Sequence, residues 1–160
     1  MDLQLKNQLF IVGGATSGFG LAVANLLLAE GASIIAIARG EANLAAMMGT
    51  NSGQVEILQA DITADGAVQQ LAAQVGKRSV HGILVNAGGP PAKTVAETTL
   101  DDWDTAYRTL LRWKVDLCKT FVPKMQKAAY GRVAFIESSS VKQYLENMVL
   151  SSSLDRKSVV

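Results

Sequence analysis

The stretch from Val12 to Gly20 holds four glycines in nine residues and restricts the possible folds more than any other part of the chain. The residues before it, Leu9 to Val12, form a continuous apolar run, which is typical of a strand buried on both faces of a parallel sheet. The residues after it, 19–30, have the periodicity of a helix that ends at Gly31. A strand, a turn and a helix in this order point the first N–H groups of the helix at the turn, where they and the helix dipole favour a phosphate. The stretch therefore predicts a phosphate-binding turn.

Three of these glycines have distinct expected roles. Gly14, Gly18 and Gly20 allow the backbone to turn tightly, to approach a pyrophosphate and to pack against the preceding strand. The same candidate segment includes Thr16, Ser17 and Phe19. The alternative is a glycine-rich turn without a ligand. The apolar face of the following helix is predicted to consist of Phe19, Val23, Leu26 and Leu27.

Strand and helix patterns alternate along the rest of the chain, which indicates a doubly wound α/β domain with a parallel sheet and right-handed crossovers. We expect a single domain over residues 1–160, with three layers (α/β/α). The predicted strands are Leu9–Val12, Ser33–Ala38, Val55–Gln59, Val80–Val85 and Arg132–Ile136. The predicted helices are 19–30, Glu41–Met48, Ala64–Val75, Leu100–Ala129 and a last one from Ser151 onward.

Two details of these helices are also predicted. Thr63 is expected to cap the helix that begins at Ala64, and Pro123 is expected to kink the long helix or divide it in two. Apolar side chains recur in the long helix at helical spacing, which favours a role in the core or in a subunit interface. They are Trp103, Tyr107, Leu110, Leu111, Leu117, Phe121 and Met125.

Composition and charge exclude several classes of function. The net charge is +1 and no basic stripe is interleaved with aromatic residues, so nucleic acid is not an expected partner. The apolar runs are too short to span a bilayer and the first six residues lack the apolar stretch of a signal peptide, so we expect a cytoplasmic protein without a membrane partner. Cys118 is the one cysteine and is interpreted as a packed core thiol; no disulfide and no metal site are expected.

Small or polar residues follow four of the predicted strands, at the edge where a doubly wound sheet binds its ligands. They are the G-x-x-x-G-x-G turn (Gly14, Gly18, Gly20), Asp61, Asn86-Ala87-Gly88 and Glu137-Ser138-Ser139-Ser140. In this order and spacing they resemble the motifs of the short-chain dehydrogenase/reductase family over essentially the whole chain. The resemblance implies a Rossmann-type fold, with five strands present of the family's seven. The family's usual threonine before the first glycine is replaced by Gly13.

The resemblance also implies roles for these residues. It places Asp61 and the adjoining Ile62 at the adenine of a nicotinamide dinucleotide, and Asn86, Ala87 and Gly88 along the nicotinamide ribose. For Asp61 the alternative is an Asx turn or a helix cap. Ser138 corresponds to the serine that polarises a substrate carbonyl, with Ser139 and Ser140 as close alternatives.

Charge indicates which dinucleotide is bound. Members of the family that use NAD usually carry an aspartate at the end of the second strand, whereas this chain has Ala38 followed by Arg39. A cation beside the adenosine ribose pairs with a 2′-phosphate, so we predict NADP rather than NAD. The alternative for Arg39 is a solvated cation at the end of a strand.

The catalytic positions depart from the family pattern. The family's reaction uses a tyrosine as proton donor, a lysine four residues later and an asparagine in the preceding long helix. At the matching positions this chain has Ser151, Asp155 and Leu110. A serine hydroxyl is far less acidic than a phenol, and a carboxylate raises the pKa of a neighbouring acid. The chain resembles a divergent subgroup, similar to oxoacyl-carrier-protein reductases, that lacks the Tyr-Lys pair.

Other residues are candidate substitutes for the missing tyrosine and lysine. Lys142 lies near the expected mouth of the site and is a second catalytic candidate, with a solvated loop lysine as the alternative; Ser151 is a third. Tyr144 has Met148 four residues later, so it does not form a Tyr-x-x-x-Lys pair. Ser139 to Lys142 matches the S-x-x-K pattern of serine hydrolases, but that pattern must open a helix. His81 lies at the wrong end of its strand for chemistry and is interpreted as structural.

Two functions therefore remain open. The first is an NADP-dependent oxidoreductase that reduces a small carbonyl compound or oxidises an alcohol with a nonstandard active site. The second is a dinucleotide-binding or assembly protein without turnover. As given, the sequence leaves the fifth strand as an apolar edge, so we expect either a homo-oligomer, a dimer or tetramer, or a domain that is incomplete at its C-terminus. We favour the latter.

Overall fold

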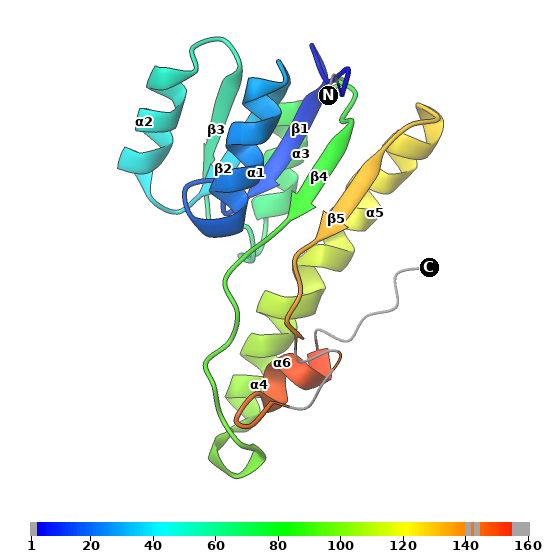
Figure 1. Cartoon of the computed structure of the whole chain (residues 1–160). Coiled ribbons are helices and arrows are strands. Elements are labelled where there is room, and N and C mark those ends of the chain that lie inside the picture. Colours follow the sequence, from blue (N-terminus) through cyan, green and yellow to red (C-terminus); the bar gives the residue numbers. More distant parts are fainter. Residues whose placement is uncertain (1–2, 140–141, 143–144, 155–160) are drawn as a thin grey trace.

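The computed structural model describes residues 3–139, 142 and 145–154. Five parallel strands form one sheet in the order β3-β2-β1-β4-β5 (Figure 1). The strands are β1 (Leu9–Gly13), β2 (Ser33–Ala38), β3 (Val55–Gln59), β4 (Gly82–Val85) and β5 (Arg132–Phe135). The α-helices are α1 (Gly18–Ala29), α2 (Glu41–Thr50), α3 (Ala67–Val75), α4 (Leu100–Tyr107), α5 (Trp113–Lys127) and α6 (Val149–Leu154). The predicted doubly wound α/β fold is confirmed.

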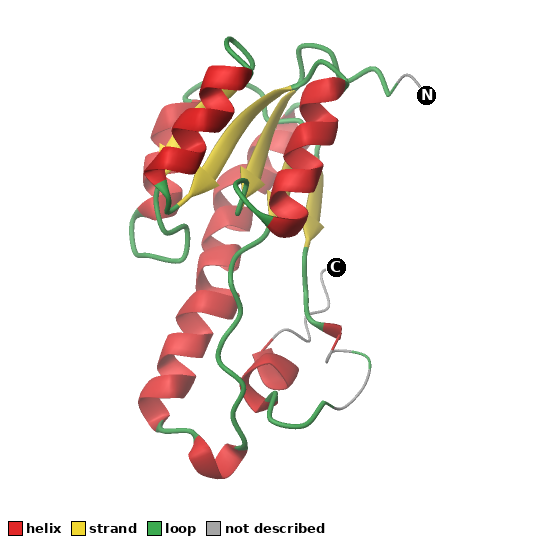
Figure 2. Ribbon diagram, turned by 60° about the vertical axis from the view of Figure 1, so that its left-hand side comes forward, coloured by secondary structure: helices red, strands yellow, loops and turns green. Residues whose placement is uncertain are grey.

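Helices cover both faces of the sheet (Figure 2). Helices α1 and α2 pack on one face, and α3 and α5 pack on the other, so each face has its own apolar core. From β1 the chain first builds outward through β2 and β3 and then crosses back to β4 on the other side of β1. The strand order therefore reverses between β1 and β4, which is where such sheets bind ligands at the carboxyl ends of the strands.

Helix α1 packs with only part of the face expected: Val23 and Leu27 lie partly buried against the core, as predicted. It buries Gly20, Ala24 and Leu28, while Phe19 and Leu26 are 71% and 68% exposed. Apolar residues occur on several sides of this helix, so periodicity alone does not select the buried side. Close backbone packing does: a Cβ atom on Gly20 would lie 2.1 Å from the carbonyl oxygen of Gly14.

One predicted detail of the helices is wrong, and one alternative of a second is excluded. Helix α3 begins at Ala67 after Gly66, whose φ of 84° ends the preceding turn, so Thr63 is not its cap. The long helix is not divided at Pro123, because α5 continues through that residue. Pro123 and Lys119, whose carbonyl loses its intrahelical donor to the proline, both lie on the exposed side of α5.

The irregularity of the long helix lies earlier. Residues Arg108–Arg112 form a π-helical turn, η2, between α4 and α5. Such turns insert one extra residue into a helix and are frequent at functional sites. Leu110 in this turn and Lys114, four residues later, both line the same cavity beyond the sheet.

Part of the chain projects beyond the carboxyl ends of the strands (Figure 1). This projecting lobe consists of residues 86–112 and 145–154, including the 3₁₀ turn η1 (Val95–Glu97). Its small core is formed by Ala106, Leu110 and Leu150. Helix α6 begins at Val149, two residues before the predicted start, where the Val149 N–H donates to the Lys93 carbonyl at 3.4 Å. Among the described residues, no helix has the length and apolarity needed to cross a membrane.

Candidate functional site

The glycine turn after β1 depends on conformations and contacts that a side chain would prevent. Gly14 and Gly18 have φ angles of 60° and 50°, in the left-handed region that favours glycine. Gly20 packs against the carbonyl oxygens of Gly13 and Gly14, leaving no room for a Cβ atom. The turn is held to β2 by the Ala15 N–H, which donates to the Ile37 carbonyl at 3.1 Å.

The end of β4 explains why a glycine occupies position 13. A Cβ atom on Gly13 would lie 2.5 Å from the carbonyl oxygen of Asn86. The side chain of Asn86 donates from Nδ2 to the Gly13 carbonyl at 3.2 Å, which ties the ends of β1 and β4 together. The threonine that the resemblance leads one to expect at position 13 would collide with this strand. Close packing between β1 and β4 accounts for the departure.

The N-terminus of α1 has donors that its own side chains do not use. Ser17 is the N-cap residue and makes no side-chain capping hydrogen bond, and the first turn has no acidic residue. The first N–H groups of a helix have no partner within the helix and carry the positive end of its dipole. In a helix of 12 residues that opens beside a glycine turn, these groups favour an anion.

A cavity of about 790 Å³ runs along the carboxyl ends of the strands from this turn, and we call it the larger cavity. It brings together residues from the ends of β1, β2, β3 and β4. The predicted residues that line it are Gly14, Thr16, Ser17, Gly18, Phe19, Arg39, Asp61, Ile62, Asn86, Ala87 and Gly88. Gly20 lies behind the turn, where it packs against the backbone.

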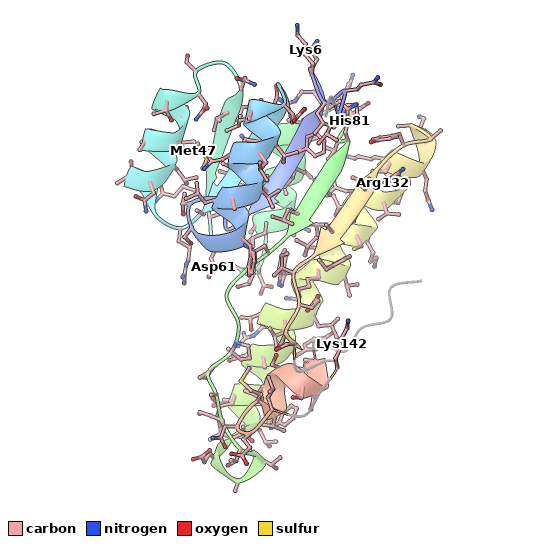
Figure 3. All side chains as sticks on the ribbon, in the orientation of Figure 1. Lys6, Met47, Asp61, His81, Arg132 and Lys142 are labelled. Carbon is pink, nitrogen blue, oxygen red and sulfur yellow. The ribbon has the colours of Figure 1, made fainter. Side chains whose placement is uncertain are left out.

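Arg39 and Asp61 lie at the β2–β3 end of the larger cavity. Arg39 is exposed, and its carbonyl oxygen accepts a hydrogen bond from Gln59 Nε2 at 3.4 Å. Asp61 Oδ1 accepts hydrogen bonds from the N–H and the hydroxyl of Thr63, at 3.0 and 2.8 Å. Asp61 therefore forms the Asx turn that was the alternative interpretation, and this turn shapes the wall of the cavity (Figure 3).

A second cavity of about 220 Å³, the smaller cavity, lies next to the larger one where β5 ends. Ala87, Gly88, Gly89, Pro90 and Thr109 line both cavities, so the two are contiguous. The smaller cavity contains Ser138 and Ser151 from separate segments, together with Leu110 from the π-helical turn. Ser151 is only 2% exposed. The structure thus brings two of the three catalytic candidates together.

An ion pair that sequence patterns did not reveal also lines the smaller cavity. Lys114 Nζ, on the first turn of α5, donates to Glu137 Oε1 at 2.9 Å. The two side chains are 7% and 20% exposed. The sequence offers one indication of this pair, a lysine within an otherwise apolar helical stripe, one turn after Leu110. Nothing in the local sequence identifies its partner, which lies 23 residues away.

The other candidates lie elsewhere. Lys142 is exposed and is not among the residues that line either cavity, and Ser139 is exposed as well. Ser140, Tyr144 and Asp155 lie outside the described residues. His81 lies at the amino ends of the strands, away from both cavities, where its Nδ1 accepts a hydrogen bond from the Leu9 N–H at 3.1 Å (Figure 3). Its structural interpretation agrees with this contact.

The start of α4 is stabilised by charges at the rim of the larger cavity. Asp102 accepts hydrogen bonds from Lys93 Nζ, at 2.8 and 2.9 Å, and from the Thr99 N–H at 2.8 Å. The Lys93 ammonium and, after it, the Thr99 N–H lower the pKa of Asp102 from 3.8 to about 2. Farther along the long helix, burial raises the pKa of the Cys118 thiol, which disfavours a thiolate nucleophile there.

Comparisons with known proteins agree with the motifs. A family model described as short chain dehydrogenase matches residues 8–153. An uncharacterised oxidoreductase of Bacillus subtilis, YvrD, is 30% identical over 152 residues, which cover 93% of this chain and 58% of the relative. D-threitol dehydrogenase of Mycolicibacterium smegmatis is 30% identical over 156 residues, which cover 92% of this chain and 59% of that protein. The chain thus spans less than two thirds of the length of these relatives.

Solved structures share the fold. A short-chain dehydrogenase from Streptomyces avermitilis superposes with a TM-score of 0.87 at 24% identity, covering 94% of this chain and 56% of that one. L-Sorbose reductase from Gluconobacter frateurii, solved with NADPH and L-sorbose, superposes with a TM-score of 0.84 at 23% identity, covering 96% of this chain and 62% of that one.

Proposed function

Because the chain belongs to the short-chain dehydrogenase family, we propose that it binds a nicotinamide dinucleotide and acts as an oxidoreductase on a small carbonyl or alcohol compound. The observation that carries this proposal is the glycine turn, which has the family's spacing and opens a helix whose first N–H groups face a cavity large enough for a dinucleotide. Binding of a nicotinamide dinucleotide is a general property of the family.

Residues of the larger cavity suit the parts of such a cofactor. The pyrophosphate would be held by the turn from Gly14 to Phe19, where two glycines with positive φ bring backbone N–H groups to the surface. The adenine would lie against Asp61 and Ile62, and the nicotinamide ribose against Asn86, Ala87 and Gly88. Asn86 already uses Nδ2 for Gly13, so its part is to position the strand ends.

We propose NADP as the preferred form. Arg39 is exposed at the cavity end next to Asp61, where the adenosine ribose would lie. A guanidinium there makes a charge-assisted hydrogen bond to a 2′-phosphate and has no such partner on NAD.

The smaller cavity would hold the substrate next to the nicotinamide. When bound, the dinucleotide supplies or accepts a hydride. Ser138, which lines this cavity, would donate a hydrogen bond to the substrate oxygen and so stabilise the charge that develops on it.

A non-catalytic dinucleotide-binding protein is the second candidate, and two residues favour it. Leu110 and Ser151 occupy the positions where the family carries an asparagine and a tyrosine, and both line the smaller cavity. Neither can replace the phenol as a proton donor, since leucine has no polar atom and a serine hydroxyl is a much weaker acid.

Titration with NADPH and NADH, followed by the fluorescence of the reduced nicotinamide, tests the proposal. We expect NADPH to bind at least tenfold more tightly than NADH, while equal weak affinity would contradict the role of Arg39. Consumption of NADPH with a panel of small ketones, abolished in Ser138→Ala, would support the oxidoreductase. Tight NADPH binding without turnover would support the second candidate.

We also propose that the chain forms a homo-oligomer. Tyr107 on α4 and Val115 on α5 are each 48% exposed, and β5 is the edge of the described sheet. Exposed apolar side chains on long helices favour association with a second copy. Light scattering after size exclusion is expected to give a multiple of the chain mass, and a monomer would contradict it.

A further inference from the structure

The Lys114–Glu137 ion pair in the smaller cavity has no part in the function proposed above. Lys114 projects from α5 and Glu137 follows β5, and Ser138 and Ser151 line the same cavity. Among the described residues that line this cavity, Lys114 carries the one positive charge.

Stability gives little reason for such a pair. Removing an ammonium and a carboxylate from water is costly, and well-packed apolar residues of similar volume are often as stable as a buried ion pair or more so. Lys114 is also flanked along its own helix by buried apolar side chains, Trp113 and Leu117. A lysine held in this position therefore points to a use for its charge or its protons.

Its position matches the chemistry that the cavity lacks. Leu110, which replaces the family's asparagine, lies one helical turn before Lys114, and both line the smaller cavity. Ser151, which replaces the tyrosine, lines it as well. An ammonium is the strongest proton donor among these side chains, and it lines the same cavity as the serine expected to bind the substrate oxygen.

We infer that Lys114 is the catalytic proton donor to the substrate oxygen in the smaller cavity, with Glu137 as the positioning residue that orients its ammonium group. This inference rests on the proposed oxidoreductase function. In the reducing direction, a hydride supplied by bound reduced nicotinamide would form a C–H bond at the carbonyl carbon, and the electron pair of the carbonyl π bond would move to the oxygen. The Lys114 Nζ–H bond breaks, an O–H bond forms with that pair, and the neutral amine takes up a proton from solvent.

The same pair restricts the class of substrate. Lys114 and Glu137 already balance each other's charge, so a substrate carboxylate would compete with Glu137 and be repelled by it. A neutral ketone or aldehyde has no charge that competes for the ammonium, so it can approach Lys114 without displacing Glu137. The geometry therefore points to a small neutral carbonyl compound rather than a keto acid.

Binding can be tested without turnover. In protein labelled with ¹³C at lysine Cε and saturated with NADP⁺, the Lys114 signal is identified by its absence in Lys114→Arg. We expect this signal to shift on titration with 2-butanone or cyclohexanone but not with pyruvate, while the signal of Lys93, paired with Asp102 outside the smaller cavity, stays unchanged. No shift with either ketone, or a shift with pyruvate alone, would overturn the inference.

Two variants test the proton donor directly. Lys114→Arg keeps the charge but supplies a guanidinium that does not deprotonate, and Lys114→Met with Glu137→Gln removes both charges together. The matched control is Arg78→Met with Glu56→Gln, an ion pair outside both cavities. We expect all three proteins to bind NADPH with an affinity within twofold of wild type. The kcat for 2-butanone should fall at least 100-fold in both Lys114 variants and stay unchanged in the control.

These outcomes separate the inference from the function on which it rests. Failure of the wild-type chain to bind NADPH or NADH would overturn the proposed function. NADPH binding with ketone turnover retained in Lys114→Arg and in the double variant would overturn the role of Lys114 alone. If the double variant does not fold, Lys114→Arg and the ¹³C titration still decide the matter.

Discussion

The two adjoining cavities are built from different parts of the polypeptide. The larger cavity lies at the ends of four strands, beside a turn in which Gly13, Gly14 and Gly20 leave no space for a Cβ atom. The smaller cavity is lined by the loop after β4, the π-helical turn, the segment after β5, and single residues of α5 and α6. The first agrees with the family motifs and the second departs from them.

Physical constraints explain this difference. A glycine that contacts backbone cannot be replaced without moving two strands, so a turn of this kind tolerates little change. Side chains around a cavity can be exchanged as long as its volume and its polar partners are preserved. The comparison predicts that substitutions in the larger cavity act on folding and dinucleotide affinity, while those in the smaller cavity act on chemistry.

Gly20→Ala is expected to have the largest effect. Its Cβ atom would lie 2.1 Å from the Gly14 carbonyl oxygen, and neither backbone segment can move away. We expect a loss of about 3 kcal/mol or more in the free energy of unfolding, measured with urea and circular dichroism, together with loss of NADPH binding.

Gly49→Ala is the control, because nothing lies within 4 Å of its Cβ position in α2. It should be stabilised by about 0.5–1 kcal/mol. Similar stabilities for the two variants would contradict the requirement for glycine at the contact between Gly20 and the Gly14 backbone.

Arg39→Glu is expected to change selectivity rather than stability. A carboxylate in place of the exposed guanidinium would remove the proposed charge-assisted hydrogen bond to the 2′-phosphate, of about 1.5–3 kcal/mol, and add repulsion. The ratio of NADPH to NADH affinity should fall at least tenfold while the urea midpoint stays unchanged. An unaltered ratio would show that Arg39 is a solvated cation.

Asn86→Ala tests the link between β1 and β4. It removes the 3.2 Å hydrogen bond from Nδ2 to the Gly13 carbonyl, which is partly buried. We expect a loss of about 1 kcal/mol in unfolding free energy and weaker binding of NADPH, both measurable in one series of titrations. Normal stability with normal affinity would argue against the positioning role given to Asn86.

Asp102→Asn addresses the projecting lobe and should have the smallest effect. Because the pKa of Asp102 is about 2 in the fold and the ordinary value is 3.8, its ionised form stabilises the native state. This contribution is complete above about pH 4 and is lost as the pH falls from 4 to 2. The midpoint of the variant should therefore lie below that of wild type at pH 6, and the two should converge near pH 2. Asp104→Asn, at an exposed carboxylate of the same helix, should show no such convergence.

Much of the fold could be predicted from local patterns. The apolar runs of β1 and β2 predict buried strands, and the glycines that follow β1 predict a turn, whatever the rest of the fold. The rotation of α1 could not be predicted in this way, because its leucines lie on several sides and the choice depends on contact between Gly20 and the preceding turn. The π-helical turn at Arg108–Arg112 likewise could not be predicted. Its residues carry no local signal, whereas the proline at position 123 indicates an irregularity at the wrong place.

The sequence by itself determined the order of strands and helices along the chain and the glycine turn, because each depends on neighbours within a few residues. Tertiary structure alone decided the smaller cavity. Lys114 and Glu137 lie 23 residues apart and come together only once α5 packs beside β5. Long-range pairs of this kind depend on how elements pack, and periodicity within a single element carries no information about them.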